Sequence, residues 1–284
     1  MRILQLLEWN LKDIIKELKT IKEQGFDYIQ ISPIQPLKEE TFNWWLLYQP
    51  CGFSIGNYWI GSKEDLIELC EEANKYDLKI TVDVICNHMA GGNNGNIIEP
   101  HKNVDPKLIE NKYFWKERKN ITNWDSRYEQ IHYCLGGLPG LDLSNYDLQD
   151  IIIDFLNELV DCGVSGFRFD AAKNIALPEE GCDFWTRVIN GIKNKDDLLL
   201  YAELIFCPKD MVDKYCKYIK VLTDSIGSDR SKMITFIESH DSYLDDVIGY
   251  TKKMSNDRVI SEYGILCSVY NNTLFYNRPF SDMY

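Results

Sequence analysis

The chain has 284 residues, with 44 Asp and Glu against 31 Lys and Arg, and a formal net charge of −13 at pH 7. Hydrophobic residues make up 45% of it, which provides enough apolar surface for a core and excludes an intrinsically disordered chain. The negative charge argues against nucleic acid and anionic lipid surfaces as partners, because both repel an acidic protein.

Nine cysteines are spread along the chain without a C-x-x-C pair. The odd count and the spacing argue against a zinc site or a disulfide framework, and free thiols in this number are typical of a reducing compartment. The first residues, MRILQLLEWNLKD, do not form a secretory signal, and no apolar run reaches the roughly 18 residues of a membrane span. If Met1 is the true start we expect a cytoplasmic protein without a membrane partner, and a secreted protein if the N-terminus is incomplete; nothing in the sequence points to an oligomeric state.

Strand and helix patterns alternate from the N-terminus. Residues 2–9, RILQLLEW, predict a strand, and apolar residues at helical spacing after Asn10 predict a helix that ends at Gly25. FDYIQIS is the second expected strand. A helix follows in SKEDLIELCEEANKYDL, where Ser62 and Asp65 have capping-box spacing, and KITVDVICNH predicts a third, buried strand.

The alternation stops between residues 89 and 140, a stretch rich in Asn, Gly and aromatic residues, where we expect an inserted subdomain. It then resumes with helices and with the strands VSGFRFD, LLLYAELI, KVLTD, MITFIESHD and TLFYNRP. Eight strands that mostly alternate with helices predict an α/β fold, a (β/α)8 TIM barrel built from residues 1–88 and 141–284. The chain stops just after the eighth strand, so the last barrel helix is not expected.

Polar residues gather where four of the expected strands end. In barrels of this kind catalysis uses the carboxyl ends of the strands, and carboxylates brought together there would destabilise the fold unless they had a function. Arg168 and Asp170 are two residues apart on one strand and therefore point to the same side. The four clusters are Asp83 with Asn87 and His88; Arg168 with Asp170 and Lys173; Glu203; and Glu238 with His240 and Asp241.

These segments resemble a known family. DVICNH, GFRFDAAK, the Glu of YAELI, and FIESHD, in that order and on those strands, are similar to the four signature regions of the α-amylase family of glycoside hydrolases, with bacterial α-amylases the nearest likeness. WWLLYQP and FSIGN in the second loop, and LPGLDL before the fourth strand, also resemble that family. The resemblance implies a TIM barrel with a small B-type domain inserted after the third strand, and it implies that the family's C-terminal β domain is absent from this chain.

The resemblance also implies catalytic roles. Retaining glycoside hydrolysis needs a carboxylate nucleophile and a carboxylic acid on either side of the bond that is cut. By resemblance Asp170 is the nucleophile, Glu203 is the general acid and then the base, and Asp241 binds sugar hydroxyls and stabilises the transition state. Arg168 beside Asp170 would hold that carboxylate ionised, because an opposite charge nearby favours the charged form.

Further residues match substrate-binding positions of the family. His88 and His240 would bind hydroxyls of the sugar at the cleavage point, and Tyr48 would stack on a sugar face with Gln49 beside it. Lys173 matches a position near the leaving-side sugars, where Asn174 replaces a common His. Asp83 is expected to give structural support, and Trp44 and Trp45 are as consistent with the core as with a sugar platform.

The leading hypothesis is an enzyme that cleaves internal α-1,4-glucosidic bonds of starch, glycogen or maltodextrins. Exo-acting and transglycosylating relatives use the same residues and stay open as alternatives. Two alternatives of another class are a non-catalytic glucan-binding protein and an inactive, truncated product.

The resemblance implies a calcium site but no organic cofactor. Its ligands would be the Asn87 side chain, a carbonyl near Ile131, the Asn174 carbonyl and a carboxylate at a position where this chain has Gly140. Calcium affinity depends on the number of charged oxygen ligands. We therefore expect weak or absent calcium binding, unless the nearby Asp142 takes over that role.

Overall fold

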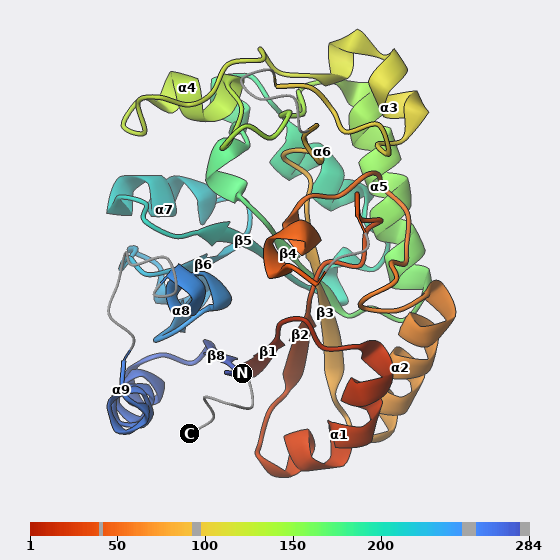
Figure 1. Ribbon diagram of the computed structural model, residues 1–284. Helices are drawn as coiled ribbons and strands as arrows, with labels where there is room; N and C mark the ends of the chain where they lie inside the picture. Colours follow the sequence, from red (N-terminus) through yellow and green to blue (C-terminus); the bar gives the residue numbers. More distant parts are fainter. Residues whose placement is uncertain (40–41, 93–97, 246–253, 279–284) are drawn as a thin grey trace.

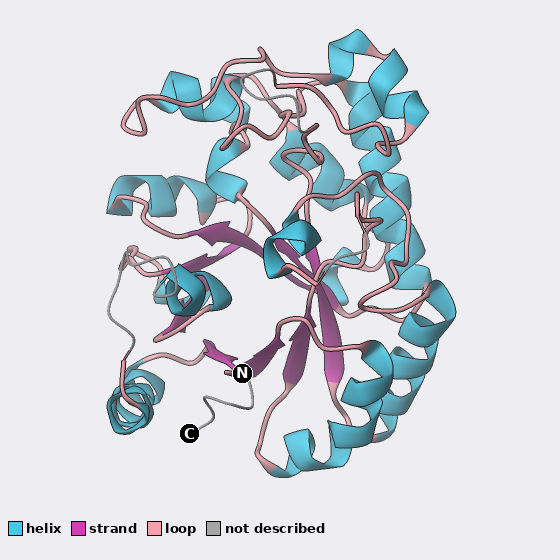
Figure 2. Cartoon of the chain, in the orientation of Figure 1, coloured by secondary structure: helices cyan, strands magenta, loops and turns pink. Residues whose placement is uncertain are grey.

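The computed structural model describes residues 1–39, 42–92, 98–245 and 254–278. Eight parallel strands close into a barrel in which each strand pairs with the next and β8 pairs with β1 (Figures 1 and 2). This confirms the predicted TIM barrel. The strands are β1 (Arg2–Leu6), β2 (Tyr28–Ile31), β3 (Lys79–Val84), β4 (Gly166–Phe169), β5 (Leu199–Leu204), β6 (Lys220–Thr223), β7 (Met233–Phe236) and β8 (Thr273–Tyr276).

Most crossovers between the strands contain a helix, and the predicted caps form. The Asn10 side chain accepts a hydrogen bond from the Lys12 amide, and Ser62 and Asp65 complete a capping box. The segment from β6 to β7 contains only a single 3₁₀ turn, Arg230–Lys232. The crossover helices are α1 (Leu11–Glu23), α2 (Lys63–Lys75), α5 (Tyr146–Asp161), α6 (Phe184–Gly191), α7 (Lys209–Tyr215) and α9 (Asn256–Val269).

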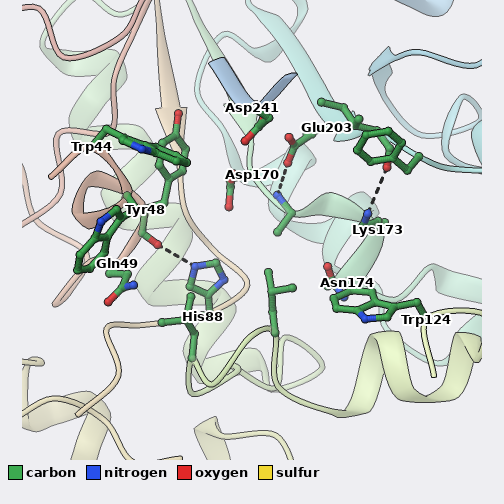
Figure 3. Close-up of a pocket in the computed structure, with 16 residues that line it drawn as sticks. Trp44, Tyr48, Gln49, His88, Trp124, Asp170, Lys173, Asn174, Glu203 and Asp241 are labelled. Atoms are coloured by element: carbon green, nitrogen blue, oxygen red, sulfur yellow. Dashed lines mark hydrogen bonds between the residues drawn. The ribbon is translucent and has the colours of Figure 1, made fainter. Parts of the chain in front are cut away.

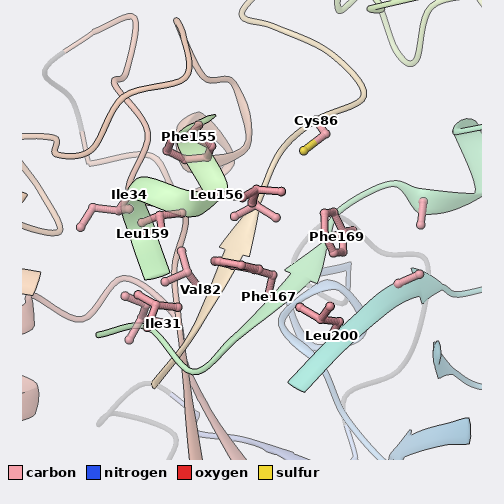
Figure 4. Packing of buried hydrophobic residues seen from close by; sticks show 14 of the residues in the cluster. Ile31, Ile34, Val82, Cys86, Phe155, Leu156, Leu159, Phe167, Phe169 and Leu200 are labelled. Carbon is pink, nitrogen blue, oxygen red and sulfur yellow. The ribbon is translucent and has the colours of Figure 1, made fainter. Parts of the chain in front are cut away.

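The alternation of side chains along the strands separates two environments. Outward-pointing residues such as Val82 and Phe167 pack beneath the helices, for example against Leu156 of α5 (Figure 4). Inward-pointing residues fill the barrel, with apolar side chains at one level and polar ones such as Gln30, whose Oε1 accepts from the Tyr201 hydroxyl at 2.6 Å, at another. Arg168 therefore points into the barrel because its neighbours Phe167 and Phe169 point outward.

The segment between β3 and α5 carries two short helices, α3 (Pro106–Glu110) and α4 (Arg127–His132), which lie beyond the carboxyl ends of the strands (Figure 1). Antiparallel bridges from His88 to Gly140 and from Trp115 to Leu141 join it to the barrel. The segment therefore lies over the end of the barrel where the predicted polar clusters are found.

The end of β7 differs from the sequence-based expectation. The strand predicted over residues 233–241 stops at Phe236, and α8 (His240–Asp245) begins after a turn in which the Ser239 amide donates to Ser242 Oγ at 3.0 Å. Asp241 therefore lies in the first turn of a short helix, although the sequence had suggested a strand end. Within the described ranges no helix is both long and apolar enough to cross a membrane.

Candidate active site

Arg168 is the centre of the predicted site. Its Nη1 donates to Asp83 Oδ1 and Oδ2, both at 2.7 Å, and to Asp170 Oδ1 at 2.9 Å. Its Nη2 lies 2.5 Å from Glu203 Oε1 and 3.9 Å from Asp241 Oδ2. The ends of β3, β4 and β5 and the start of α8 thus place four carboxylates around one buried guanidinium.

Three of these carboxylates face an open cavity of about 380 Å³ (Figure 3). Asp170, Glu203 and Asp241 lie in the middle of the view, with Trp44, Tyr48, Gln49 and His88 on one side and Lys173, Asn174 and Trp124 on the other. Asp83 is buried and does not line this cavity. The cavity combines apolar walls with a carboxylate floor, an arrangement common in sites for polar ligands.

Burial raises the pKa values of the two predicted catalytic carboxyls, although Arg168 lies beside both. Burial raises the pKa of Asp170 to about 7, with a further contribution from Glu203, although Arg168 opposes the shift. Burial also raises the pKa of Glu203. Arg168 therefore acts on Asp170 in the direction expected from the sequence, toward the ionised form, but burial of the carboxyl has the larger effect on its pKa.

Asp241 has a different environment. Burial would raise its pKa, but His240 and Arg168 outweigh that effect and hold it below the usual range. His240 Nε2 lies 3.2 Å from Asp241 Oδ1, and Gln5 anchors His240 from β1, with its Nε2 2.8 Å from the ring Nδ1 and its Oε1 accepting from the backbone amide. Gln5 was not singled out from the sequence, since a strand Gln has no signal of its own.

Tyr48 connects the cavity wall to the charged floor. Its ring stacks on the His240 ring, with centroids 4.9 Å apart and planes 7° from parallel, and its hydroxyl donates to Asp83 Oδ2 at 3.1 Å. The Trp44 ring meets both of these rings edge-on. Trp45 lines the same cavity, so both tryptophans are at the mouth of the site.

His88 and Gln49 lie on the same wall, but they differ in whether their polar atoms have hydrogen-bond partners. His88 Nε2 is 2.9 Å from the Tyr48 carbonyl and Nδ1 is 3.3 Å from Asn87 Nδ2, so both ring nitrogens have protein partners. Burial lowers the pKa of His88 to about 4, which makes the ring neutral. Gln49 Oε1 is buried and has no hydrogen-bond partner within the part of the chain that the structure describes.

The opposite wall comes from the loops after β4 and β5 and from the inserted segment. Lys173 Nζ donates to the Ile205 carbonyl at 3.2 Å and lies 5.9 Å from the centre of the Trp124 ring. Trp124 and Phe206 line the cavity although both side chains are largely exposed. Neither of these two aromatic residues could be singled out from the sequence, because neither lies in a signature segment.

Glu238, which the sequence placed in the same cluster as Asp241, has a structural partner instead. Its carboxylate binds Arg278 through Nε at 2.8 Å and through Nη2, and both side chains are buried. Arg278 also donates to Asn256 Oδ1 at 2.6 Å, which joins the end of β7 to the start of α9. Glu238 does not line the cavity.

The residues implied as calcium ligands do not fit a calcium ion. The Lys116 ammonium donates to Asn87 Oδ1 and to the Asn174 carbonyl, both at 2.8 Å. Desolvation lowers the pKa of Lys116 to about 8, so it is mainly a cation at neutral pH. Asp142 Oδ1 accepts hydrogen bonds from Ser144. No cluster of three or more metal-binding side chains occurs among the described residues.

Comparisons with known proteins agree with this geometry. The family model "Alpha amylase, catalytic domain" matches residues 9–261. An α-amylase of Clostridium acetobutylicum is 34% identical over 273 residues, covering 85% of this chain and 35% of the relative, and one of Butyrivibrio fibrisolvens is 26% identical, covering 98% and 34%. The chain thus spans about a third of the length of these relatives.

Solved structures share the fold. The crystal structure of an α-amylase from Geobacillus thermoleovorans in complex with acarbose superimposes with a TM-score of 0.78 at 18% identity, covering 97% of this chain and 69% of that one. The match of the family model to most of the sequence, together with the relative at 34% identity, shows that this chain belongs to the α-amylase family.

Proposed function

We propose that the chain forms the catalytic part of a retaining glycoside hydrolase that cleaves internal α-1,4-glucosidic bonds of starch, glycogen or maltodextrins. The observation that carries the proposal is the convergence of Asp170, Glu203 and Asp241 on one guanidinium at the floor of an open cavity. Family membership makes an α-glucan the expected substrate class.

The proposed reaction has two steps. Asp170 attacks the anomeric carbon while Glu203 protonates the glycosidic oxygen, which leaves with the departing chain. Glu203, now ionised, then takes a proton from the water that releases the sugar from Asp170. The raised pKa of Glu203 supports its role as the acid, because the group must hold a proton before the first step.

Asp241 is proposed to remain ionised throughout. Its lowered pKa supports this role, since a carboxylate beside the anomeric carbon stabilises the positive charge that develops in the transition state. Tyr48 would contact the sugar on one side of the cut, and Lys173 with Trp124 would contact the sugars on the other. Cavity walls on both sides of the carboxylates favour internal cleavage over removal of terminal units.

The test is product analysis on soluble starch, with release of reducing ends compared with the loss of iodine staining. Internal cleavage is expected to abolish staining after few cuts and to give a mixture of oligosaccharides. A maltooligosaccharide with a blocked non-reducing end provides the matched control, because an exo-acting enzyme would leave it intact.

Two other outcomes would support the alternatives. Products longer than the substrate would indicate transglycosylation, which uses the same carboxylates. Binding of starch without any release of reducing ends, by protein that melts cooperatively, would support a non-catalytic glucan-binding protein.

A further inference from the structure

We propose that the Lys116 ammonium is a built-in replacement for a bound calcium ion, holding the inserted segment to the ends of β3 and β4. The resemblance to the family implies four calcium ligands, and the ammonium is bound to two of them, Asn87 Oδ1 and the Asn174 carbonyl, at 2.8 Å each. Both acceptors are buried, and either would lose a charged partner if the lysine were removed.

The backbone fixes Lys116 in this place. Its amide donates to the Gly140 carbonyl at 2.9 Å, and the Leu141 amide donates to the Asn87 carbonyl at 2.8 Å. Three segments that are distant in the sequence are therefore held side by side, around residues 87, 116 and 140. The ammonium also binds the Asn174 carbonyl, and so connects the inserted segment to a loop that lines the cavity.

The position of the Lys116 side chain requires that residue 140 has no side chain. A Cβ atom at position 140 would lie 2.9 Å from Lys116 Cδ, so the aliphatic part of the lysine occupies the space that a side chain there would need. The backbone of Gly140 is not in the left-handed region, so its conformation does not demand glycine. Residue 140, where the resemblance implies an anionic ligand, therefore has no carboxylate, and the side chain of the cationic Lys116 occupies the space beside it.

The loop that carries Asn174 is also tied to the inserted segment through a second hydrogen bond. Asn174 Nδ2 donates to the Gln130 carbonyl at 3.0 Å, which ties the same loop to α4 next to Ile131. Asp142 Oδ1 accepts hydrogen bonds from the amide and the hydroxyl of Ser144, so the carboxylate nearest to the missing ligand has partners of its own. A divalent ion at this place would meet the ammonium as a like charge, and such contact is unfavourable in a desolvated site.

The experiment measures melting temperature and calcium binding, so it does not depend on the proposed activity. Chelator-treated wild-type protein, titrated calorimetrically with calcium at slightly acidic pH, should give no binding heat, and its melting temperature should not change with calcium. Sub-micromolar binding, or a melting temperature that rises with calcium, would overturn the proposal.

Substitutions separate the ammonium from the stem of the side chain. Lys116→Met keeps the apolar stem but leaves two acceptors without their cation, and should lower the melting temperature by about 3 to 10 °C. Lys107→Met, at an exposed position of the same segment, is the matched control and should change little. Equal melting temperatures for Lys116→Met and the wild type would contradict the proposal.

A double variant tests whether the two cations are interchangeable. Lys116→Ala with Gly140→Asp removes the ammonium, opens the space and supplies an anionic oxygen ligand. Its melting temperature should rise with calcium and fall with chelator; if it does not fold without metal, the same comparison is made on refolding with and without calcium. A double variant indifferent to calcium in both measurements would show that Lys116 does not occupy a metal position.

Discussion

Arg168 and Asp83 form a buried ion pair in which one guanidinium nitrogen lies 2.7 Å from both carboxylate oxygens. Asp83 is buried and does not line the cavity, and burial raises its pKa to about 6 even beside this cation. Because the same guanidinium also binds Asp170 and Glu203, the ion pair orients Arg168 toward the cavity. Asp83, Asp170 and Glu203 therefore share the single positive charge of Arg168, which does not compensate for the burial of every one of these carboxyls at neutral pH.

The first prediction concerns the three carboxylates of the cavity floor. Asp170→Asn, Glu203→Gln and Asp241→Asn should each reduce turnover of starch by at least about a hundredfold, because they remove in turn the nucleophile, the general acid and base, and the charge that stabilises the transition state. Asp125→Asn, an exposed carboxylate near the mouth, is the control and should keep its activity. Starch cleavage by Asp170→Asn at the wild-type rate would refute the proposed mechanism.

The second prediction is a loss of activity on the alkaline side. The reaction needs an ionised Asp170 and a protonated Glu203, and this one proton leaves the pair as the pH rises through the higher of its two apparent pKa values. Burial raises the pKa of both carboxyls, to about 7 for Asp170, so we expect kcat/KM to fall on the alkaline side. A profile that stays flat from neutral pH far into the alkaline range would show that no such proton is needed.

The third prediction is that Asp170→Asn stabilises the fold. The pKa of Asp170 is higher in the folded than in the unfolded chain, so its favourable contribution is complete at acid pH and is lost as the pH rises through about 7. The asparagine variant should therefore melt at a higher temperature than the wild type at neutral pH, by about 2 to 4 °C for each kcal/mol relieved.

This gain in stability should shrink as the pH falls toward about 4, where the aspartate is neutral in both states. Thermal unfolding of both proteins across this pH range measures it. A gain that is independent of pH would mean that the buried charge is not its cause.

The fourth prediction concerns two glycines outside the left-handed region. A Cβ at Gly166, inside the barrel, would lie 2.3 Å from the Leu199 carbonyl oxygen, so Gly166→Ala should destabilise the fold by about 1 to 3 kcal/mol. Gly264 lies in the exposed part of α9, where a Cβ would meet nothing within 4 Å among the described residues outside its own stretch of helix, and Gly264→Ala should stabilise by about 0.5 to 1 kcal/mol. Denaturant unfolding of the pair checks both signs, and equal effects would show that the close approach in the barrel is relieved at no cost.

The sequence alone determined the barrel and the candidate catalytic residues. The strand at residues 79–84 and the helix at 63–75 could be predicted because their apolar spacing and caps are local properties that the barrel does not override. That the polar ends of β3, β4 and β5 lie close together could also be predicted, since the parallel strands of a barrel place their carboxyl ends at one mouth. The path after Phe236 could not be predicted, because the apolar residues of β7 continue into a turn whose hydrogen bonds involve serine side chains.

Tertiary structure alone decided how the charges are shared and what occupies the expected metal position. Glu238 and Asp241 are three residues apart in one motif. In the folded chain, however, Glu238 forms an ion pair with Arg278, whereas Asp241 lines the cavity. Gly140 showed in the sequence that a carboxylate is missing, whereas Lys116 had no signal among the other lysines of the inserted segment. Its ammonium reaches Asn87 and Asn174 because backbone hydrogen bonds align residue 116 with residue 140, and pairing between loops follows from no local pattern.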